Sequence, residues 1–220
     1  MKNNSNYKKN SNFIHTGQDL NTYVINESIE IVPPVDFPTK HGEFKLYGFY
    51  QKAIDKLHTA VVKGNPSGKS AVPVRVHSEC HTGDVFGSKR CDCGEQLDAA
   101  LQYIANQECG IVIYLKQEGR GIGLRNKLKA YALQDSGWDT VEANEQLGFP
   151  AETRTYQVGA EIINWFGIKS IILLTNNPDK ITKLKNDGIN IESRKPLIVS
   201  PNTHSLRYLN TKKQKMGHLF

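Results

Sequence analysis

The second half of the chain alternates short apolar runs with longer amphipathic stretches. Residues 110–115 read GIVIYL and residues 170–174 read SIILL, and continuous apolar runs of this length are typical of strands buried on both faces. Apolar residues recur at intervals of three and four over residues 95–106, 124–132 and 156–166, which predicts helices. This alternation predicts an α/β fold with a mostly parallel sheet, flanked by helices in three layers.

Shorter strands are expected elsewhere in the chain. Apolar and polar residues alternate over residues 43–47, and residues 58–63 and 72–77 are rich in β-branched residues, so each segment predicts a strand. These three segments predict a β-rich N-terminal portion. Two more short segments, residues 138–143 and 189–192, are also expected to be strands.

The N-terminal residues differ in composition from the rest of the chain. The first twelve contain five asparagines and three lysines and no acidic residue, which favours disorder and predicts no signal peptide. Pro33, Pro34 and Pro38 then indicate extended backbone. We therefore expect residues 1–33 to be a disordered or extended N-terminal extension, and residues 34–220 to form the main domain.

Three polar or glycine-rich segments follow predicted strands. They are the cysteine-containing segment 78–94, the turn QEGRGIG at residues 117–123, and the turn TNNP at residues 175–178. Ligands of parallel sheets bind at the carboxyl ends of the strands, and a turn that opens a helix offers backbone N–H groups to an anion. An ordinary tight turn remains the alternative for QEGRGIG, and a solvated lysine remains the alternative for Lys180.

Three of the four cysteines lie close together in the sequence. Cys80, Cys91 and Cys93 have the spacing Cys-x10-Cys-x-Cys, which differs from the paired knuckles of zinc fingers. Three thiolates bind a tetrahedral zinc ion and leave its fourth position open, as in catalytic sites. The alternative is three inert buried cysteines, although the polar neighbours argue against it. Clustered cysteines favour metal binding in a reducing cytoplasm over disulfides, and Cys109 is expected to be a small buried residue.

The overall charge indicates an anionic partner. The net charge is +6 and the isoelectric point is near 9.0, which suits a nucleotide or a nucleic acid. The mean hydropathy is −0.49, and no apolar run reaches the roughly 18 residues of a membrane helix. The basic segment from residue 203 onward is expected to be a solvated helical tail.

Six motifs in order resemble the GTP cyclohydrolase II family: RVHSECHTGDVFGSKRCDCG, QEGRGIGL, KAYALQD, DTVEANEQLGF, LLTNNPDK and KMGHL. The resemblance covers residues 34–220 and is to the stand-alone form of the enzyme. It implies hydrolysis of GTP to 2,5-diamino-6-hydroxy-4-(5-phosphoribosylamino)pyrimidine, formate and pyrophosphate, the first step of riboflavin biosynthesis. It also implies a GTP cyclohydrolase II-like fold and a cytoplasmic homodimer with no membrane partner.

The resemblance also implies the cofactors and the functional residues. Zn²⁺, one per chain, would be bound by Cys80, Cys91 and Cys93, and Mg²⁺ would accompany the GTP triphosphate. Tyr131 resembles the family's catalytic tyrosine. The residues that resemble its GTP contacts are Arg75, Val76, His77, Ser78, Glu79, Gln96, Glu118, Gly119, Arg120, Thr140, Thr175 and Lys180.

The remaining catalytic pair departs from the family pattern. The family uses an acidic residue and an arginine two positions later, which correspond to Glu152 and Arg154 here, but the family's acid is usually aspartate. Two roles stay open for Arg154. It attacks the α-phosphate as a nucleophile, or it acts as a positive clamp on the departing pyrophosphate. The nucleophilic role is chemically demanding because attack needs a neutral guanidine group, and the arginine side chain is almost never neutral at pH 7.

Two other functions compete with this interpretation. A zinc nucleobase deaminase uses an H-x-E motif, which His77 and Glu79 imitate, but its P-C-x-x-C half is missing here. A zinc-stabilised nucleic-acid-binding module would explain the basic isoelectric point and C-terminus. However, the chain has no recognised nucleic-acid motif, which makes a nucleic-acid partner unlikely on sequence grounds.

Overall fold

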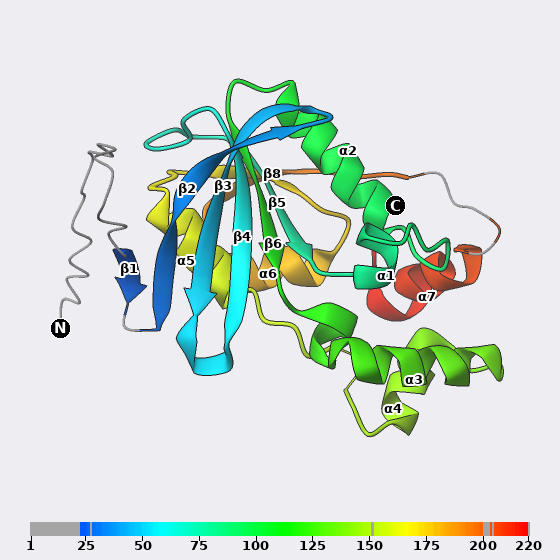
Figure 1. Cartoon of the computed structure of the whole chain (residues 1–220). Coiled ribbons are helices and arrows are strands. Elements are labelled where there is room, and N and C mark those ends of the chain that lie inside the picture. Colours follow the sequence, from blue (N-terminus) through cyan, green and yellow to red (C-terminus); the bar gives the residue numbers. More distant parts are fainter. Residues whose placement is uncertain (1–22, 27, 151, 200–202, 204, 220) are drawn as a thin grey trace.

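The computed structural model describes residues 23–26, 28–150, 152–199, 203 and 205–219. In this part of the chain, eight strands form one sheet in the order β1-β2-β3-β4-β6-β5-β7-β8 (Figure 1). The strands are β1 (Tyr23–Asn26), β2 (Ile29–Thr39), β3 (Gly42–Gln51), β4 (Lys56–Lys63), β5 (Val72–Ser78), β6 (Gly110–Leu115), β7 (Ile171–Leu174) and β8 (Ile191–Lys195).

The sheet has an antiparallel half and a parallel half. Strands β1 to β4 pair antiparallel with one another, and β4 pairs antiparallel with β6. Strand β5 pairs parallel with both β6 and β7, and β7 pairs parallel with β8. The expected α/β fold with a β-rich N-terminal portion is therefore confirmed. The expectation of a mostly parallel sheet holds only for its core, because parallel pairing is confined to β5, β6, β7 and β8.

Strand β2 runs through the boundary that we expected between residues 33 and 34. Ile29 and Ile31 are buried in the core, so this segment belongs to the sheet. The pairing with β3 shifts register between Val32 and Val35, around Pro33 and Pro34. Proline lacks an N–H group and is tolerated in sheets at such irregularities. Residues 1–22 of the expected extension lie outside the described residues.

Helices cover both faces of the sheet, as three layers require. Helices α5 and α6 pack on one face, and α2 packs on the other. The helices are α1 (His81–Asp84), α2 (Cys93–Ala105), α3 (Gly123–Asp135), α4 (Thr140–Gln146), α5 (Gln157–Trp165), α6 (Pro178–Asn186) and α7 (Leu206–Met216), with 3-10 turns η1 (Lys52–Ile54) and η2 (Glu118–Gly121).

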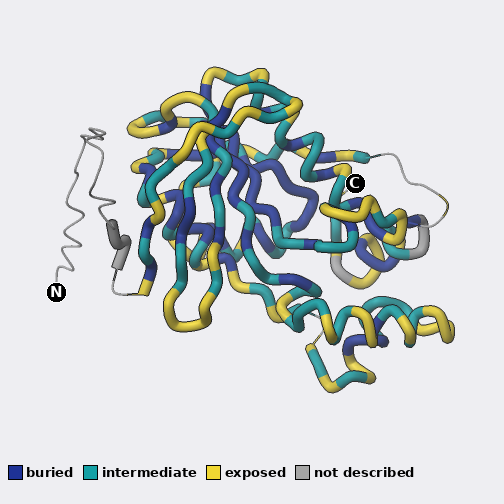
Figure 2. Tube along the Cα trace, in the orientation of Figure 1, coloured by how far each residue is buried: buried dark blue, intermediate teal, exposed yellow. Residues whose placement is uncertain are grey.

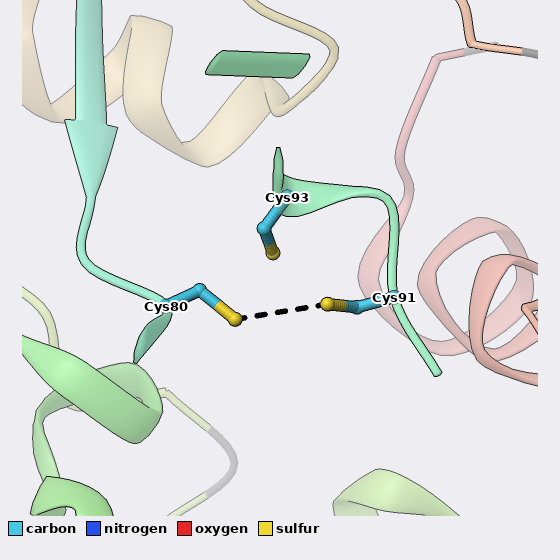
Figure 3. A group of neighbouring side chains, drawn as sticks. All are labelled: Cys80, Cys91 and Cys93. Carbon is cyan, nitrogen blue, oxygen red and sulfur yellow. Dashed lines mark hydrogen bonds between the residues drawn. The ribbon is translucent and has the colours of Figure 1, made fainter. Parts of the chain in front are cut away.

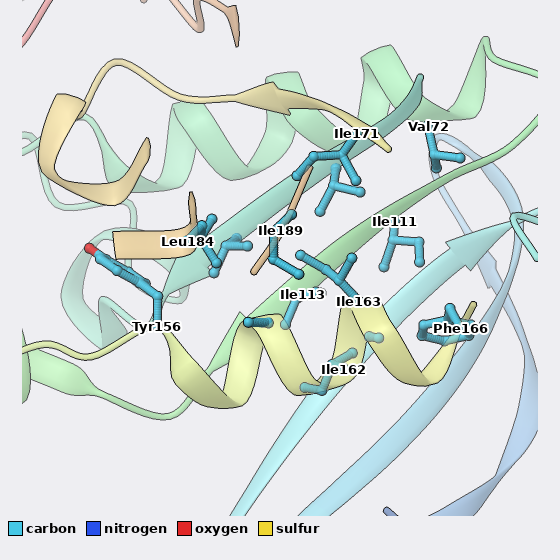
Figure 4. Packing of buried hydrophobic residues seen from close by; sticks show 14 of the residues in the cluster. Val72, Ile111, Ile113, Tyr156, Ile162, Ile163, Phe166, Ile171, Leu184 and Ile189 are labelled. Carbon is cyan, nitrogen blue, oxygen red and sulfur yellow. The ribbon is translucent and has the colours of Figure 1, made fainter. Parts of the chain in front are cut away.

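Alternation along the central strands produces two separate cores. On β6, Ile111 and Ile113 face α5 and pack with Ile163 (Figure 4). Val112 faces the opposite side and packs with Ile104 of α2. Successive side chains of a strand point to opposite faces of the sheet, and both faces are apolar here. This is why the segment reads as a continuous apolar run.

Helices α3 and α4 extend away from the sheet, and Ala130 is the buried residue of α3, whose other residues are intermediate or exposed (Figure 2). The prediction of a strand at residues 138–143 was wrong, because helix α4 begins at Thr140. Asp139 accepts hydrogen bonds from the N–H groups of Val141 and Glu142, and the Glu142 carboxylate accepts the Asp139 N–H in return. This reciprocal capping box fixes the start of a helix that is too short to show apolar periodicity.

The C-terminal segment forms helix α7, as expected, but it is not a solvated tail. Thr211 and Lys212 are buried, α7 contacts α4, and Lys212 pairs with Asp92, the residue before α2. Within the described residues, no helix combines the length and the apolarity needed to cross a membrane.

One buried histidine makes the stability of the fold sensitive to acid. His58 on β4 accepts the Lys116 N–H through Nδ1 at 3.0 Å, and its Nε2 lies 3.2 Å from Gln51 Oε1. Burial, together with the positive charges of Lys56 and Lys116, lowers the pKa of His58 to about 4. The imidazole is therefore neutral in the folded chain.

We predict that His58→Asn reduces the loss of stability on acidification. Between about pH 6.5 and about pH 4, the unfolded chain binds a proton at His58 that the folded chain does not, so stability falls as the pH falls. Asparagine keeps an acceptor for Lys116 and does not titrate. The variant should lose about 1–3 kcal/mol less than the parent over this range, as measured by urea unfolding. If the free energy of unfolding depended on pH identically in both proteins, the lowered pKa of His58 would be contradicted.

Candidate active site

The three segments singled out in the sequence meet at one edge of the sheet. The cysteine-containing segment follows β5, η2 follows β6, and the TNNP turn follows β7. These strands run parallel, so their carboxyl ends lie side by side. The predicted convergence of the three segments is thus confirmed.

The three clustered cysteines point toward a common centre (Figure 3). Cys80 lies just beyond β5, Cys91 lies on the following loop, and Cys93 is the first residue of α2. Their Sγ atoms all lie within 4.8 Å of one another, and those of Cys80 and Cys91 are 3.6 Å apart. Tetrahedral zinc–sulfur bonds of about 2.3 Å place sulfur atoms about 3.8 Å apart, so the cluster fits a metal ion of this size.

A glycine allows the backbone of α1 to approach the sulfur atoms. A Cβ atom on Gly83 would lie 2.9 Å from the Cys91 Sγ and 3.2 Å from the Cys80 Sγ. Any side chain at this position would press on the cluster. The same Cβ atom on Gly83 would also lie 3.2 Å from the Cβ atom of Cys93.

Contacts among the three thiols favour ionisation of Cys80 and disfavour ionisation of Cys91 and Cys93. Hydrogen bonds from Cys91 and Cys93 hold the pKa of Cys80 far below its usual range. The same contact with Cys80 raises the pKa of Cys91 to about 11, and contacts with both neighbours raise the pKa of Cys93 well above its ordinary value. Ionising all three therefore requires a bound cation, which is the electrostatic environment of a metal site.

Lys127 supplies a positive charge beside the cluster. Its Nζ lies 3.1 Å from the Cys80 Sγ and 2.8 Å from Glu118 Oε1. Burial alone would lower the pKa of Lys127, but the charges of Cys80 and Glu118 raise it above its usual value. Glu118 also accepts the N–H groups of His81 and Gly119, so its carboxylate joins the cysteine loop to η2.

The QEGRGIG turn has an unusual backbone. Gly119 and Arg120 both have φ near +60°, a conformation that is costly for arginine. Thr153 donates a hydrogen bond to the Arg120 carbonyl at 2.5 Å, and a Cβ atom on Gly121 would lie 2.3 Å from the Thr153 Oγ1. The turn is thus packed against the segment that carries Glu152, and it presents Arg120 at the site.

Tyr131 on α3 reaches toward the cysteine cluster. Its hydroxyl lies 3.2 Å from the Thr82 Oγ1, which lies 3.7 Å from the Cys80 Sγ. The guanidinium of Arg90 lies over its ring at 5.0 Å. Burial raises the pKa of Tyr131, so its phenol keeps its proton near neutral pH.

Glu152 and Arg154 form a close ion pair. The Arg154 Nε donates to Glu152 Oε1 at 2.7 Å, the Arg154 backbone N–H donates to the same oxygen at 2.9 Å, and Nη2 donates to Oε2. Burial alone would raise the pKa of Glu152, but its contacts with Arg154 lower it. Burial would likewise lower the pKa of Arg154, but Tyr156 and Glu152 raise it. Both groups are therefore charged.

A buried carboxylate that the sequence analysis missed supports the cysteine loop. Asp84 lies 3.1 Å from the His77 Nε2, accepts the Cys80 N–H at 2.9 Å and accepts the Tyr114 hydroxyl at 2.8 Å. Burial lowers the pKa of His77, so a neutral imidazole donates to Asp84. The signal in the sequence that could have identified Asp84 is its position in the segment HTGD, between Cys80 and Cys91.

Two adjoining cavities contain most of the residues expected from the sequence. Their empty volumes, which include space open to solvent, are about 660 and 580 Å³. Cavity 1 contains all three cysteines, and cavity 2 lies between β5, β7 and α7. The expected residues around cavity 1 are Ser78, Glu79, Cys80, Cys91, Cys93, Glu118, Gly119, Arg120, Tyr131, Thr140 and Arg154, and those around cavity 2 are Arg75, His77, Ser78, Cys93, Gln96, Arg120, Arg154, Thr175 and Lys180.

Two expected residues do not line either cavity. The Val76 side chain is fully buried in the apolar core, and only its carbonyl contributes, by accepting a hydrogen bond from the Lys180 Nζ. Glu152 contacts Arg154 and does not itself line a cavity. Among the residues that the sequence analysis did not assign to the site, Tyr208, Lys212 and His218 line cavity 2.

Cavity 2 is lined by several basic side chains. None of the described residues that line it is acidic, and Arg75, Arg120, Arg154 and Lys180 all reach it. Burial, followed by the charges of Arg75 and Arg154, lowers the pKa of Lys180 well below its ordinary value. Asn177 caps α6 at the same place by accepting the Asp179 N–H at 3.0 Å. A helix N-terminus among buried cations is an environment that favours an anion.

The chain is similar to a known protein family and to several known proteins. The model of the GTP cyclohydrolase II family matches residues 30–196. The chain is 56% identical over 186 residues to the riboflavin biosynthesis protein RibBA of Synechocystis, covering 83% of this chain and 33% of that protein. It is 52% identical over 199 residues to the RibBA protein of Bacillus subtilis, covering 90% of this chain and 49% of that protein.

The chain therefore spans about a third to a half of the length of these RibBA relatives. A further relative has a comparable length. The GTP cyclohydrolase-2 of Picrophilus torridus is 50% identical over 192 residues, which cover 87% of this chain and 100% of that protein. The extent of these matches and the geometry of the site agree, and the chain belongs to the GTP cyclohydrolase II family.

Proposed function

We propose that the protein hydrolyses GTP to 2,5-diamino-6-hydroxy-4-(5-phosphoribosylamino)pyrimidine, formate and pyrophosphate. The observation that carries the proposal is the direct connection between a three-cysteine cluster and a cationic cavity. The cluster can hold a metal ion with one open position, and the cavity can hold a triphosphate. This combination matches a reaction that opens a purine ring and cleaves a phosphoanhydride.

The two cavities suit different parts of the substrate. Cavity 1 combines the cysteine cluster with Tyr131, Ile122 and Ala130, which suits a flat base whose C8 atom faces the metal. Cavity 2 suits the triphosphate. Arg120 and Arg154 line both cavities, so the α-phosphate belongs between them. Guanidinium groups suit this position because they bind phosphate oxygens in pairs.

The proposed cofactors follow from the donor atoms. A zinc ion held by Cys80, Cys91 and Cys93 would supply Lewis acidity and a water of lowered pKa for attack on C8. Among the described residues, this cluster is the one group of three or more metal-binding side chains. Mg²⁺ would therefore be held mainly by the triphosphate and water, which is its usual mode with nucleotides.

Tyr131 is the residue placed to manage a proton during ring opening. Its protonated phenol lies in cavity 1, next to Thr82 and the cysteine cluster. A hydroxyl at this position can hold a water molecule or donate to a ring nitrogen as the ring opens. Lys127 contributes by balancing the charge of Cys80 rather than by binding phosphate.

Arg154 acts as a positive clamp in this proposal, and not as a nucleophile. The hydrogen bonds with Glu152 stabilise the charged guanidinium, whereas nucleophilic attack needs its neutral form. Glu152 reaches Arg154 through its longer side chain, so glutamate can replace the family's usual aspartate. The clamp would stabilise the charge that develops on the departing pyrophosphate.

The competing functions have less support in the geometry. In a deaminase the histidine of H-x-E binds zinc, but His77 faces Asp84, and Glu79 pairs with Lys116. In a nucleic-acid-binding module the basic C-terminus would face outward, but Lys212 pairs with Asp92 and Lys215 pairs with Glu142. A homodimer and a cytoplasmic location are part of the proposal through the resemblance alone.

The test of this function is incubation of the purified protein with GTP and Mg²⁺, followed by assays of both formate and pyrophosphate. We expect both products, and about one zinc ion per chain by metal analysis. Cys91→Ser should lose the zinc and both products because one of three ligands is removed. The same change at Cys109, which lies outside the cluster, should retain both. Full zinc occupancy in Cys91→Ser would exclude the proposed ligands.

We predict that Tyr131→Phe slows formate release by roughly 100-fold, the scale of general acid–base catalysis. Phenylalanine keeps the packing and removes only the hydroxyl, so the melting temperature should change little. The matched control is Tyr103→Phe on α2, because Tyr103 lies outside both cavities. Formate release at the parental rate in Tyr131→Phe would exclude a catalytic hydroxyl.

The pair Glu152 and Arg154 gives a prediction that separates a clamp from a nucleophile. Glu152→Gln keeps the length and removes the charge, and it should slow pyrophosphate release roughly tenfold or more. Arg154→Lys should retain a measurable part of the activity because lysine still supplies a positive charge. Complete loss in Arg154→Lys, together with a guanylylated parent protein in mass spectra, would instead identify a nucleophile.

A further inference from the structure

Helix α7 lies beyond the part of the chain that the family model matches, yet it forms one wall of cavity 2. The match ends at residue 196, whereas Tyr208, Lys212 and His218 line the cavity. Burial, followed by the charges of Lys212 and Arg154, lowers the pKa of His218 to about 3, so its imidazole stays neutral. The wall therefore contributes one cation, which is Lys212.

Lys212 is bound to the loop that carries the cysteines. Its Nζ donates to Asp92 Oδ1 at 2.7 Å, and the side chains of Lys212 and Asp92 are only 10% and 5% exposed. Asp92 is the residue between Cys91 and Cys93. The Lys212 Nζ also lies 4.3 Å from the centre of the Tyr208 ring. Removing one partner of a buried ion pair leaves an uncompensated charge, so this contact constrains both segments.

The ion pair continues as a chain of hydrogen bonds from Asp92 to the end of β7. Gln96 Nε2 donates to Asp92 Oδ2 at 2.6 Å, and Arg75 Nη2 donates to Gln96 Oε1 at 2.7 Å. Arg75 Nη1 then donates to the carbonyl of Leu174 at the end of β7, at 3.0 Å. Reversing the Gln96 amide would set donor against donor and acceptor against acceptor, so Lys212 fixes Gln96 and Arg75 through Asp92.

Three more contacts hold α7 and the residues after it in place. The Leu219 N–H donates to the carbonyl of Asn176 in the TNNP turn at 2.8 Å. Lys215 pairs with Glu142 of α4 at 3.0 Å and also with Asp139. Lys213, the next residue after Lys212, is exposed and offers a matched comparison.

We propose that α7 is part of the phosphate-binding site, in which Lys212 positions Gln96 and Arg75 through Asp92 and directs its remaining N–H groups toward the ligand. An ammonium group has three donors, and the described contact with Asp92 uses one. The ligand is a diphosphate or triphosphate group. The inference rests on the proposed function for the identity of the nucleotide, but phosphate binding by cavity 2 can be measured without catalysis.

The probe is inorganic pyrophosphate, and its dissociation constant is measured by calorimetry with the full chain. Lys212→Met should weaken binding about tenfold or more, because a charge-assisted hydrogen bond and the arrangement of two neighbours are lost. Lys213→Met removes the same charge from the same helix, and it should change binding less than twofold. Equal dissociation constants for the two variants would overturn the proposal.

Two readouts distinguish positioning from a general effect on folding. Lys212→Arg keeps the charge and the contact with Asp92, so it should restore most of the pyrophosphate affinity. Loss of zinc to a chelator should be faster in Lys212→Met than in Lys213→Met, because Asp92 lies between two of the ligands. Failure of the arginine to restore binding, or equal zinc loss, would count against the proposal.

If Lys212→Met does not fold, hydrogen exchange on the unmodified protein provides the test. Pyrophosphate should slow amide exchange in α7, because the helix forms a wall of the occupied cavity. Unchanged exchange in α7 at saturating pyrophosphate would overturn the proposal. A protein that binds pyrophosphate in this way but releases no formate from GTP would refute the proposed function and leave the role of α7 standing.

Discussion

The concentration of negative charge on three neighbouring sulfur atoms is the constraint on which the site depends. Thiolates within 4.8 Å of one another repel strongly in a buried setting, so the cluster is stable only with a cation or with shared protons. The surrounding residues reflect this. Lys127 contacts Cys80 directly, and Lys212 balances the carboxylate between Cys91 and Cys93. Basic side chains from α3 and from α7 therefore meet at the cysteine loop.

The sequence predicted the central strands well because their apolar runs carry the signal within a few residues. Residues 110–115 form β6 as expected, and the three cysteines that are close in sequence also lie close together in space. The antiparallel strand β2 was hidden by Pro33 and Pro34, which a register shift accommodates. Helix α4 was mistaken for a strand because its stability comes from a capping box and not from apolar periodicity.

The burial of Lys212 could not be predicted from local sequence. Three lysines within residues 212–215 read as a solvated face, and only the fold brings one of them to Asp92, 120 residues earlier. Asp84 has two partners nearby in sequence, His77 and Cys80, but its contact with Tyr114 on β6 depends on the fold in the same way. Interactions of this kind are long-range, and a periodicity or composition argument contains no information about them.

The position of glutamate at residue 152 illustrates how such a site tolerates change. Glu152 does not line either cavity, so it has no substrate surface to match and needs only to reach the guanidinium of Arg154. The backbone N–H of Arg154 also donates to Glu152 Oε1, which folds the longer side chain back over its own segment. A residue that acts through a neighbour can thus gain a methylene group while the charge and the direction of its hydrogen bonds are kept. A residue in the cysteine cluster has no such freedom, because its sulfur atom must meet a fixed bond length.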